Sequence, residues 1–127
     1  MHQAMFWEKL AGDKVRCRLC RFFCIIADGQ RGHCGVRGNQ QGELVSLVYG
    51  RLIADNIDPI EKKPLFHYLP GSTSYSIATV GCNFRCRHCQ NADIAQWPQR
   101  ATDIPGRVCS PEQVVRRARQ AGCRSIS

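Results

Sequence analysis

The first half of the chain carries few regular hydrophobic repeats. Residues 3–11 are a candidate for a short helix, with Met5, Trp7 and Leu10 available for packing, and Gly12 and Asp13 are expected to end it. Apolar residues dominate positions 42–48, GELVSLV, on both of the alternating faces of an extended chain. This run predicts a strand that packs on both faces.

Residues 49–73 follow, and three prolines argue against regular helix there. We interpret this stretch as an extended connector. Its charged residues include Asp55, Asp58, Glu61 and Lys62. Such residues either approach a site or, as is more common for charged side chains, face solvent.

The last third of the chain is more regular. The run YSIATV at 75–80 predicts a buried strand, and the helix predicted over 110–121 has marked ends. Ser110 and Gln113 form a capping-box pattern, Pro111 takes the first helical position, and Gly122 ends the helix. Its predicted apolar face consists of Val114, Val115, Ala118 and Ala121. A second short strand is expected over 123–127.

Strand, loop, helix and strand in this order predict a βαβ unit with parallel strands, and hence an α/β fold. We divide the chain into a Cys-rich module over 1–48, the connector over 49–73 and the βαβ portion over 74–127. A parallel sheet needs several neighbouring strands and cover on both faces. We therefore expect the chain to end inside a larger fold.

Composition narrows the classes of protein. The net charge is +8 and 14 of the 18 basic residues are Arg, which permits nucleic acid or an acidic protein as a partner. The basic residues are spread along the chain, however, so a solvated surface is the favoured interpretation and nucleic acid is not expected. No apolar run approaches the ~20 residues of a membrane helix. The first residues lack the pattern of a signal peptide, so we expect a cytoplasmic protein without a membrane partner.

Nine cysteines are many for 127 residues. Their number is odd and they stand in tight groups, which favours metal binding in a reducing compartment over disulfides. Cys82, Cys86 and Cys89 have C-x3-C-x2-C spacing on a loop that follows the strand predicted at 75–80. Three thiolates can hold three corners of a 4Fe–4S cluster, and the fourth iron is then open to a small molecule.

A second group, Cys17, Cys20, Cys24 and Cys34, has the spacing C-x2-C-x3-C-x9-C. Four thiolates match the closed shell of structural zinc. A second iron–sulfur cluster is an alternative, because four cysteines also serve iron. In another alternative one cysteine is only a small buried residue and His33 supplies a ligand.

The C-x3-C-x2-C loop resembles the signature of radical S-adenosylmethionine (SAM) enzymes. Within them the chain is similar to the pyruvate formate-lyase activating enzyme-like subgroup, and above all to the radical SAM enzymes of the AmmeMemoRadiSam system. The likeness covers nearly the whole chain, whereas members of that family are much longer. It runs through Cys17-x2-Cys20-x3-Cys24, GHCGVR at 32–37, YGRLIADNIDPIEKKPLFHYLPGS at 49–72, GCNFRCRHCQN at 81–91 and SPEQVVRRARQAGCRSIS at 110–127.

The resemblance implies a partial (β/α)6 barrel, of which this chain holds the first strand, the first helix and the start of the second strand. It implies that Cys82, Cys86 and Cys89 bind a 4Fe–4S cluster whose fourth iron is chelated by SAM. Reductive cleavage of SAM would give a 5′-deoxyadenosyl radical that abstracts hydrogen from a substrate. His88 stands where the family usually places an aromatic residue near adenine. The implied partners are a one-electron donor protein and a substrate, for which a protein is one candidate.

Two other classes stay open. One is a zinc-binding module that contacts nucleic acid, in which His88 or Cys109 would complete a second zinc site with the three loop cysteines. The other is a non-catalytic fragment that needs a partner chain to complete the barrel. Whether this chain is active as an enzyme is therefore open as well.

Overall fold

The computed structural model describes residues 2–127 and divides into two compact units. The first contains Tyr49 and the residues before it, together with Val80–Pro105, and the second contains Gly50–Thr79 and Gly106–Ser127. The boundary near residue 49 lies close to the predicted end of the Cys-rich module. The predicted part 74–127 is instead shared between the units, because Val80–Pro105 packs with the N-terminal residues.

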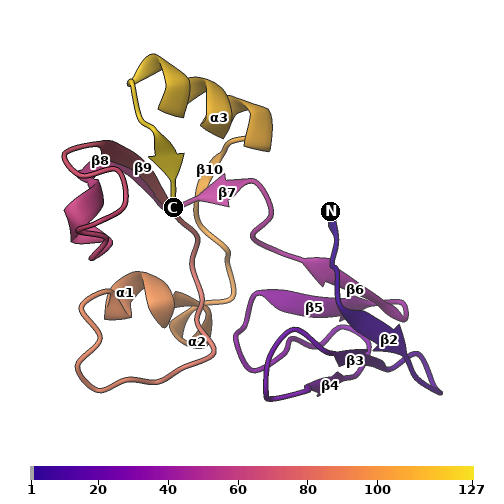
Figure 1. Cartoon of the computed structure of the whole chain (residues 1–127). Coiled ribbons are helices and arrows are strands. Elements are labelled where there is room, and N and C mark those ends of the chain that lie inside the picture. The colour runs from indigo at the N-terminus through magenta and orange to yellow at the C-terminus, as the bar shows by residue number, and fades with distance from the viewer. Residues whose placement is uncertain (1) are drawn as a thin grey trace. The chain divides into compact units, whose positions relative to one another are not determined.

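The first unit is built from short strands and two single-turn helices (Figure 1). Strands β2, β3 and β4 form one antiparallel sheet, and β1, β6 and β5 form another. The elements are β1 (His2–Gln3), β2 (Trp7–Lys9), β3 (Val15–Cys17), β4 (Ile25–Ile26), β5 (Arg37–Gln40), β6 (Glu43–Ser46), α1 (Ala92–Ala95) and α2 (Trp97–Arg100).

The helix predicted over residues 3–11 is wrong. The backbone N–H of Ala4 donates to the carbonyl of Leu44 (2.8 Å), and Phe6 adopts a φ of +55°, which interrupts any helix. Residues 7–9 then pair with β3 as β2. Strand pairing, of β2 with the following strand β3 and of β1 with the more distant β6, therefore outweighs the weak local preference for helix. The strand predicted over 42–48 is present in shorter form as β6.

The core of the first unit is small. One buried cluster comprises Ala4, Val15, Cys17, Ile26 and Leu44, with Trp7 and Cys24 packed against it. Buried Asn39 joins the segments around this core, because its side-chain amide donates to the carbonyls of Asp13 (2.7 Å) and Ile26 (2.8 Å). Two cysteines of the N-terminal group thus belong to the packed interior or its edge.

The second unit has a three-stranded sheet in the order β11-β9-β8 (Figure 1). Strands β9 and β11 are parallel, and β8 is antiparallel to β9. Strands β7 and β10 form a separate antiparallel pair. The elements are β7 (Arg51–Leu52), β8 (Ala54–Pro59), the 3-10 helix η1 (Ile60–Lys62), β9 (Thr73–Ala78), β10 (Arg107–Val108), α3 (Pro111–Gln120) and β11 (Ser125–Ile126).

Helix α3 confirms the boundaries predicted from its capping residues. The Ser110 hydroxyl accepts from the N–H of Gln113 (3.3 Å), and the Gln113 side chain accepts from the N–H of Ser110 (2.9 Å). Val114 and Ala118 are buried, whereas Val115 and Ala121 are exposed. The predicted apolar face is therefore narrower than expected. The parallel pairing of β9 with β11 agrees with the predicted βαβ order, and its place in a barrel stays a prediction.

The connector predicted over 49–73 is more ordered than expected, because residues 54–59 pair along their whole length with β9. Pro59 stands at the end of β8, where a missing N–H is tolerated. Across residues 2–127, none of the helices has the length and apolar character needed to span a membrane.

Candidate metal centre

The loop from Gly81 to Asn91 contains no helix or strand and carries three cysteines. The N–H of Gly81 donates to the carbonyl of Ile94 (3.0 Å), which closes the base of the loop. Inside it, the N–H of Phe84 donates to the Cys82 sulfur (3.4 Å). Cys82 and Cys89 are partly buried and Cys86 is exposed.

Gly81 sets the path of the chain into this loop. Its φ is +96°, and a Cβ atom built on it would lie 2.4 Å from Cγ1 of Val36 and 3.1 Å from the carbonyl oxygen of Cys34. Both the dihedral angle and the space therefore require glycine. The loop begins in close contact with the N-terminal residues.

Arg85 makes a second connection between the loop and the N-terminal residues. Its guanidinium donates to the carbonyls of Cys82 (2.8 Å) and Phe84 (2.9 Å), and also to the carbonyl of His33 (2.8 Å). Gln99 donates to the same His33 carbonyl (3.2 Å). The cysteine loop and the turn around His33 are thus joined by side-chain hydrogen bonds.

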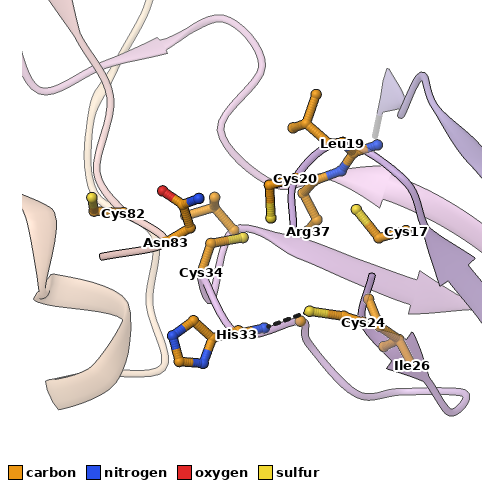
Figure 2. Close-up of a pocket in the computed structure, with 13 residues that line it drawn as sticks. Cys17, Leu19, Cys20, Cys24, Ile26, His33, Cys34, Arg37, Cys82 and Asn83 are labelled. Carbon is orange, nitrogen blue, oxygen red and sulfur yellow. Dashed lines mark hydrogen bonds between the residues drawn. The ribbon is translucent and has the colours of Figure 1, made fainter. Parts of the chain in front are cut away.

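The second cysteine group is distributed over two turns. Cys17 ends β3, Cys20 lies in the turn that follows, and Cys24 precedes β4, whereas Cys34 lies in the turn before β5. These four residues line one pocket of about 350 Å³ (Figure 2). Cys82 and Asn83 of the loop also line it.

His33 takes part in this pocket through its backbone. Its N–H donates to the Cys24 sulfur (3.4 Å), shown as the dashed line in Figure 2. Its imidazole stacks on the ring of Phe22, with 4.2 Å between the centroids. The backbone of His33 thus helps to orient the Cys24 sulfur.

All nine cysteines are free thiols. Within residues 2–127 the structure gathers no group of three His, Cys, Asp or Glu side chains closely enough to hold a metal ion. The chemistry of both donor sets nevertheless fits a metal, since each group has a sulfur that accepts a backbone N–H, and such hydrogen bonds tune metal-bound thiolates. Binding would require the thiols of each group to converge.

The remaining predicted site residues are dispersed. His88 is exposed on the loop. Cys109, considered above as a fourth ligand, is buried in the second unit and packs with Leu52, Tyr75 and Val114. It is thus a core residue in this structure.

Two charge networks of the second unit were not found from the sequence. The carboxylate of Asp58 receives hydrogen bonds from Lys62 (2.8 Å), Ser76 (2.6 Å) and Lys63 (3.1 Å), which together hold its pKa well below the usual range. The i,i+4 spacing of Asp58 and Lys62 was the available signal. These contacts join β8, η1 and β9.

The second network centres on Asp55. It accepts a hydrogen bond from the Tyr75 hydroxyl and another from Arg107 (2.7 Å). These bonds lower the pKa of Asp55 and, because the hydroxyl proton is held by a carboxylate, raise the pKa of Tyr75. The network joins β8, β9 and β10, and its role in this structure is structural.

Comparison with known proteins identifies a relative whose function is not characterised. The chain is 49% identical over 127 residues to the uncharacterized protein MJ0808 of Methanocaldococcus jannaschii. It spans 38% of the length of that protein. No family model and no solved structure matches the chain.

Proposed function

We propose that this chain is the cluster-binding segment of a radical SAM enzyme. The observation that carries the proposal is the loop from Gly81 to Asn91, which presents three free thiols and is closed at its base by the hydrogen bond from Gly81 to Ile94. Three thiolates on one loop supply three of the four ligands of a 4Fe–4S cluster and leave one iron for a small molecule. The resemblance of GCNFRCRHCQN to the radical SAM signature supports SAM as that molecule.

In this proposal each loop residue has a defined part. Cys82, Cys86 and Cys89 are the cluster ligands, and the N–H of Phe84 orients the Cys82 sulfur. Arg85 fixes the loop because its guanidinium donates to the carbonyl of Cys82 within the loop and to the carbonyl of His33 outside it. The exposed imidazole of His88 is available to contact adenine. When bound, the cluster supplies the single electron that cleaves the sulfonium bond of SAM, which yields the radical for hydrogen abstraction.

The matched protein of Methanocaldococcus jannaschii is longer, since the chain spans 38% of it. We assign the remaining SAM contacts and the substrate pocket to barrel strands outside these 127 residues, so turnover requires them. A one-electron donor protein is also required. We place the protein in the cytoplasm, because free thiols and reducible clusters suit a reducing compartment.

Iron and sulfide analysis after anaerobic reconstitution tests this proposal. We expect the wild-type chain to carry about four more irons than the variant with Cys82→Ser, Cys86→Ser and Cys89→Ser, because one cubane is lost. Cys123→Ser, a change in the second unit, is the matched control and should retain the iron of the wild type. Equal iron in the triple variant and the wild type would refute the assignment of the cluster to this loop.

A further inference from the structure

The four N-terminal cysteines form a group that the proposed cluster does not use. Cys17, Cys20 and Cys24 belong to the β3–β4 hairpin, and Cys34 comes from the turn before β5. Figure 2 shows their sulfur atoms facing a common space, with side chains from both segments around it. Four thiols from two separate turns therefore line one pocket.

The module around this pocket has little apolar core. Its buried cluster comprises five residues, two of which are alanine and cysteine, while Met5, Phe6 and Leu19 are largely exposed. A small domain with so little buried apolar surface commonly needs a cross-link such as a disulfide or a structural metal. The four cysteines are not paired as disulfides in this structure, and four thiols are the ligand set of a structural metal that can supply such a cross-link.

We propose that Cys17, Cys20, Cys24 and Cys34 bind one zinc ion that cross-links the β3–β4 hairpin to the turn before β5. Four thiolates complete the tetrahedral shell of zinc, so this centre is structural and has no open position for a substrate. The C-x2-C spacing in a hairpin turn is typical of structural zinc sites.

The pocket has the surroundings that such an ion requires. Ile26 and Val36 line it alongside the cysteines and contribute apolar surface. The N–H of His33 already donates to the Cys24 sulfur. Zn–S bonds of about 2.3 Å place the sulfur atoms of a tetrahedral site about 3.8 Å apart. Because no three of these side chains lie close enough to hold a metal ion in the described residues, their sulfur atoms would have to draw closer when zinc binds.

The zinc centre would also order the cysteine loop. The turn that carries Cys34 is the surface against which Gly81 packs, and the carbonyl of its neighbour His33 accepts from Arg85 and Gln99. Fixing this turn fixes the base of the loop. This consequence rests on the proposed function, whereas zinc binding itself does not.

Metal analysis of the full 127-residue chain tests the inference. We expect one zinc per chain in the aerobically purified wild type and also in the triple Ser variant of Cys82, Cys86 and Cys89. The double variant Cys20→Ser and Cys34→Ser should lose it. Cobalt substitution of the triple variant should give the strong visible bands of tetrahedral cobalt bound to thiolates.

Three results would overturn the inference. They are a wild-type chain that takes up no zinc or cobalt, a triple loop variant that loses its zinc, and a triple loop variant that takes up iron and sulfide in place of zinc. The last result would assign a second cluster to the N-terminal group. If the double variant fails to fold, chelation of the wild type followed by zinc addition decides the matter, because circular dichroism should report loss and recovery of structure. Retention of zinc with no iron at the loop would refute the proposed function alone.

Discussion

At the scale of single residues, Gly81 shows how the cysteine loop depends on the N-terminal residues. Its φ of +96° and the 2.4 Å approach to Val36 exclude any side chain at this position. The sequence marked Gly81 only as the residue before the first loop cysteine. Its partner lies 45 positions earlier in the chain, a separation that local patterns do not reveal.

Replacing Gly81 with alanine should destabilise the first unit. The matched control is Gly12→Ala, because Gly12 also has a positive φ (+67°) but has open space around it. The control should lower the free energy of unfolding by about 1–2 kcal/mol through backbone strain. Gly81→Ala should lower it by about 1–3 kcal/mol more through overpacking against Val36. Chemical denaturation measures both, and equal losses would contradict the close contact.

The carboxylate of Asp58 should make the second unit sensitive to acid. Its pKa in the folded chain is lowered by Lys62, Ser76 and Lys63, whereas the unfolded value is about 3.9. The stabilisation is therefore complete above about pH 4 and is lost as the pH falls toward the folded pKa. Asp58→Asn should destabilise the chain more at pH 7 than at pH 3.

Urea denaturation at the two pH values measures this difference. Asp93→Asn is the control, since Asp93 is 96% exposed and its 3.5 Å contact with Arg100 adds little stability. A destabilisation by Asp58→Asn that is the same at both pH values would contradict the role of the charged form.

At the scale of elements, predictions held where local chemistry decides the structure. The capping box of α3 uses two residues three positions apart, and both of its hydrogen bonds are present. The parallel strand after α3 also follows from local order. The helix predicted over 3–11 failed because β1 pairs with the distant strand β6 and β2 pairs with the following strand β3. Strand β8 was not predicted from the sequence, because its extent depends on pairing with β9.

The N-cap of α3 can be tested on its own. Ser110→Ala should lower the free energy of unfolding by about 1 kcal/mol, because the N–H of Gln113 loses its acceptor. Ser110→Asp keeps an acceptor at this position and should lose much less. Hydrogen exchange of the first turn of α3 measures the local effect, and equal exchange in both variants would count against the capping box.

At the scale of the whole molecule, the cysteine spacings suggested two candidate metal centres, the loop cysteines and the N-terminal cysteines. No sequence pattern indicated that both groups lie in the first unit. Residues 80–105 pack with the N-terminal residues even though β9 and α3 lie in the other unit. The pocket lined by Cys17, Cys34 and Cys82 is the consequence. The arrangement depends on contacts between distant segments, such as Arg85 with His33.

The net charge of +8 permits binding to nucleic acid, and the strength of that binding tests the nucleic-acid alternative. We expect only weak binding to DNA or RNA, with dissociation constants of about 10⁻⁴–10⁻⁶ M at physiological salt and a steep salt dependence. Fluorescence anisotropy with labelled oligonucleotides measures it. Nanomolar, sequence-dependent binding by the zinc form would instead favour a nucleic-acid-binding module.

We propose that the loop cysteines hold a cluster with one iron open to SAM. Electron paramagnetic resonance of the reconstituted, dithionite-reduced chain, with and without SAM, tests it most directly. We predict the signal of a reduced 4Fe–4S cluster that changes when SAM is added and is absent from the triple Ser variant of Cys82, Cys86 and Cys89. A cluster signal that survives in that variant would contradict the account.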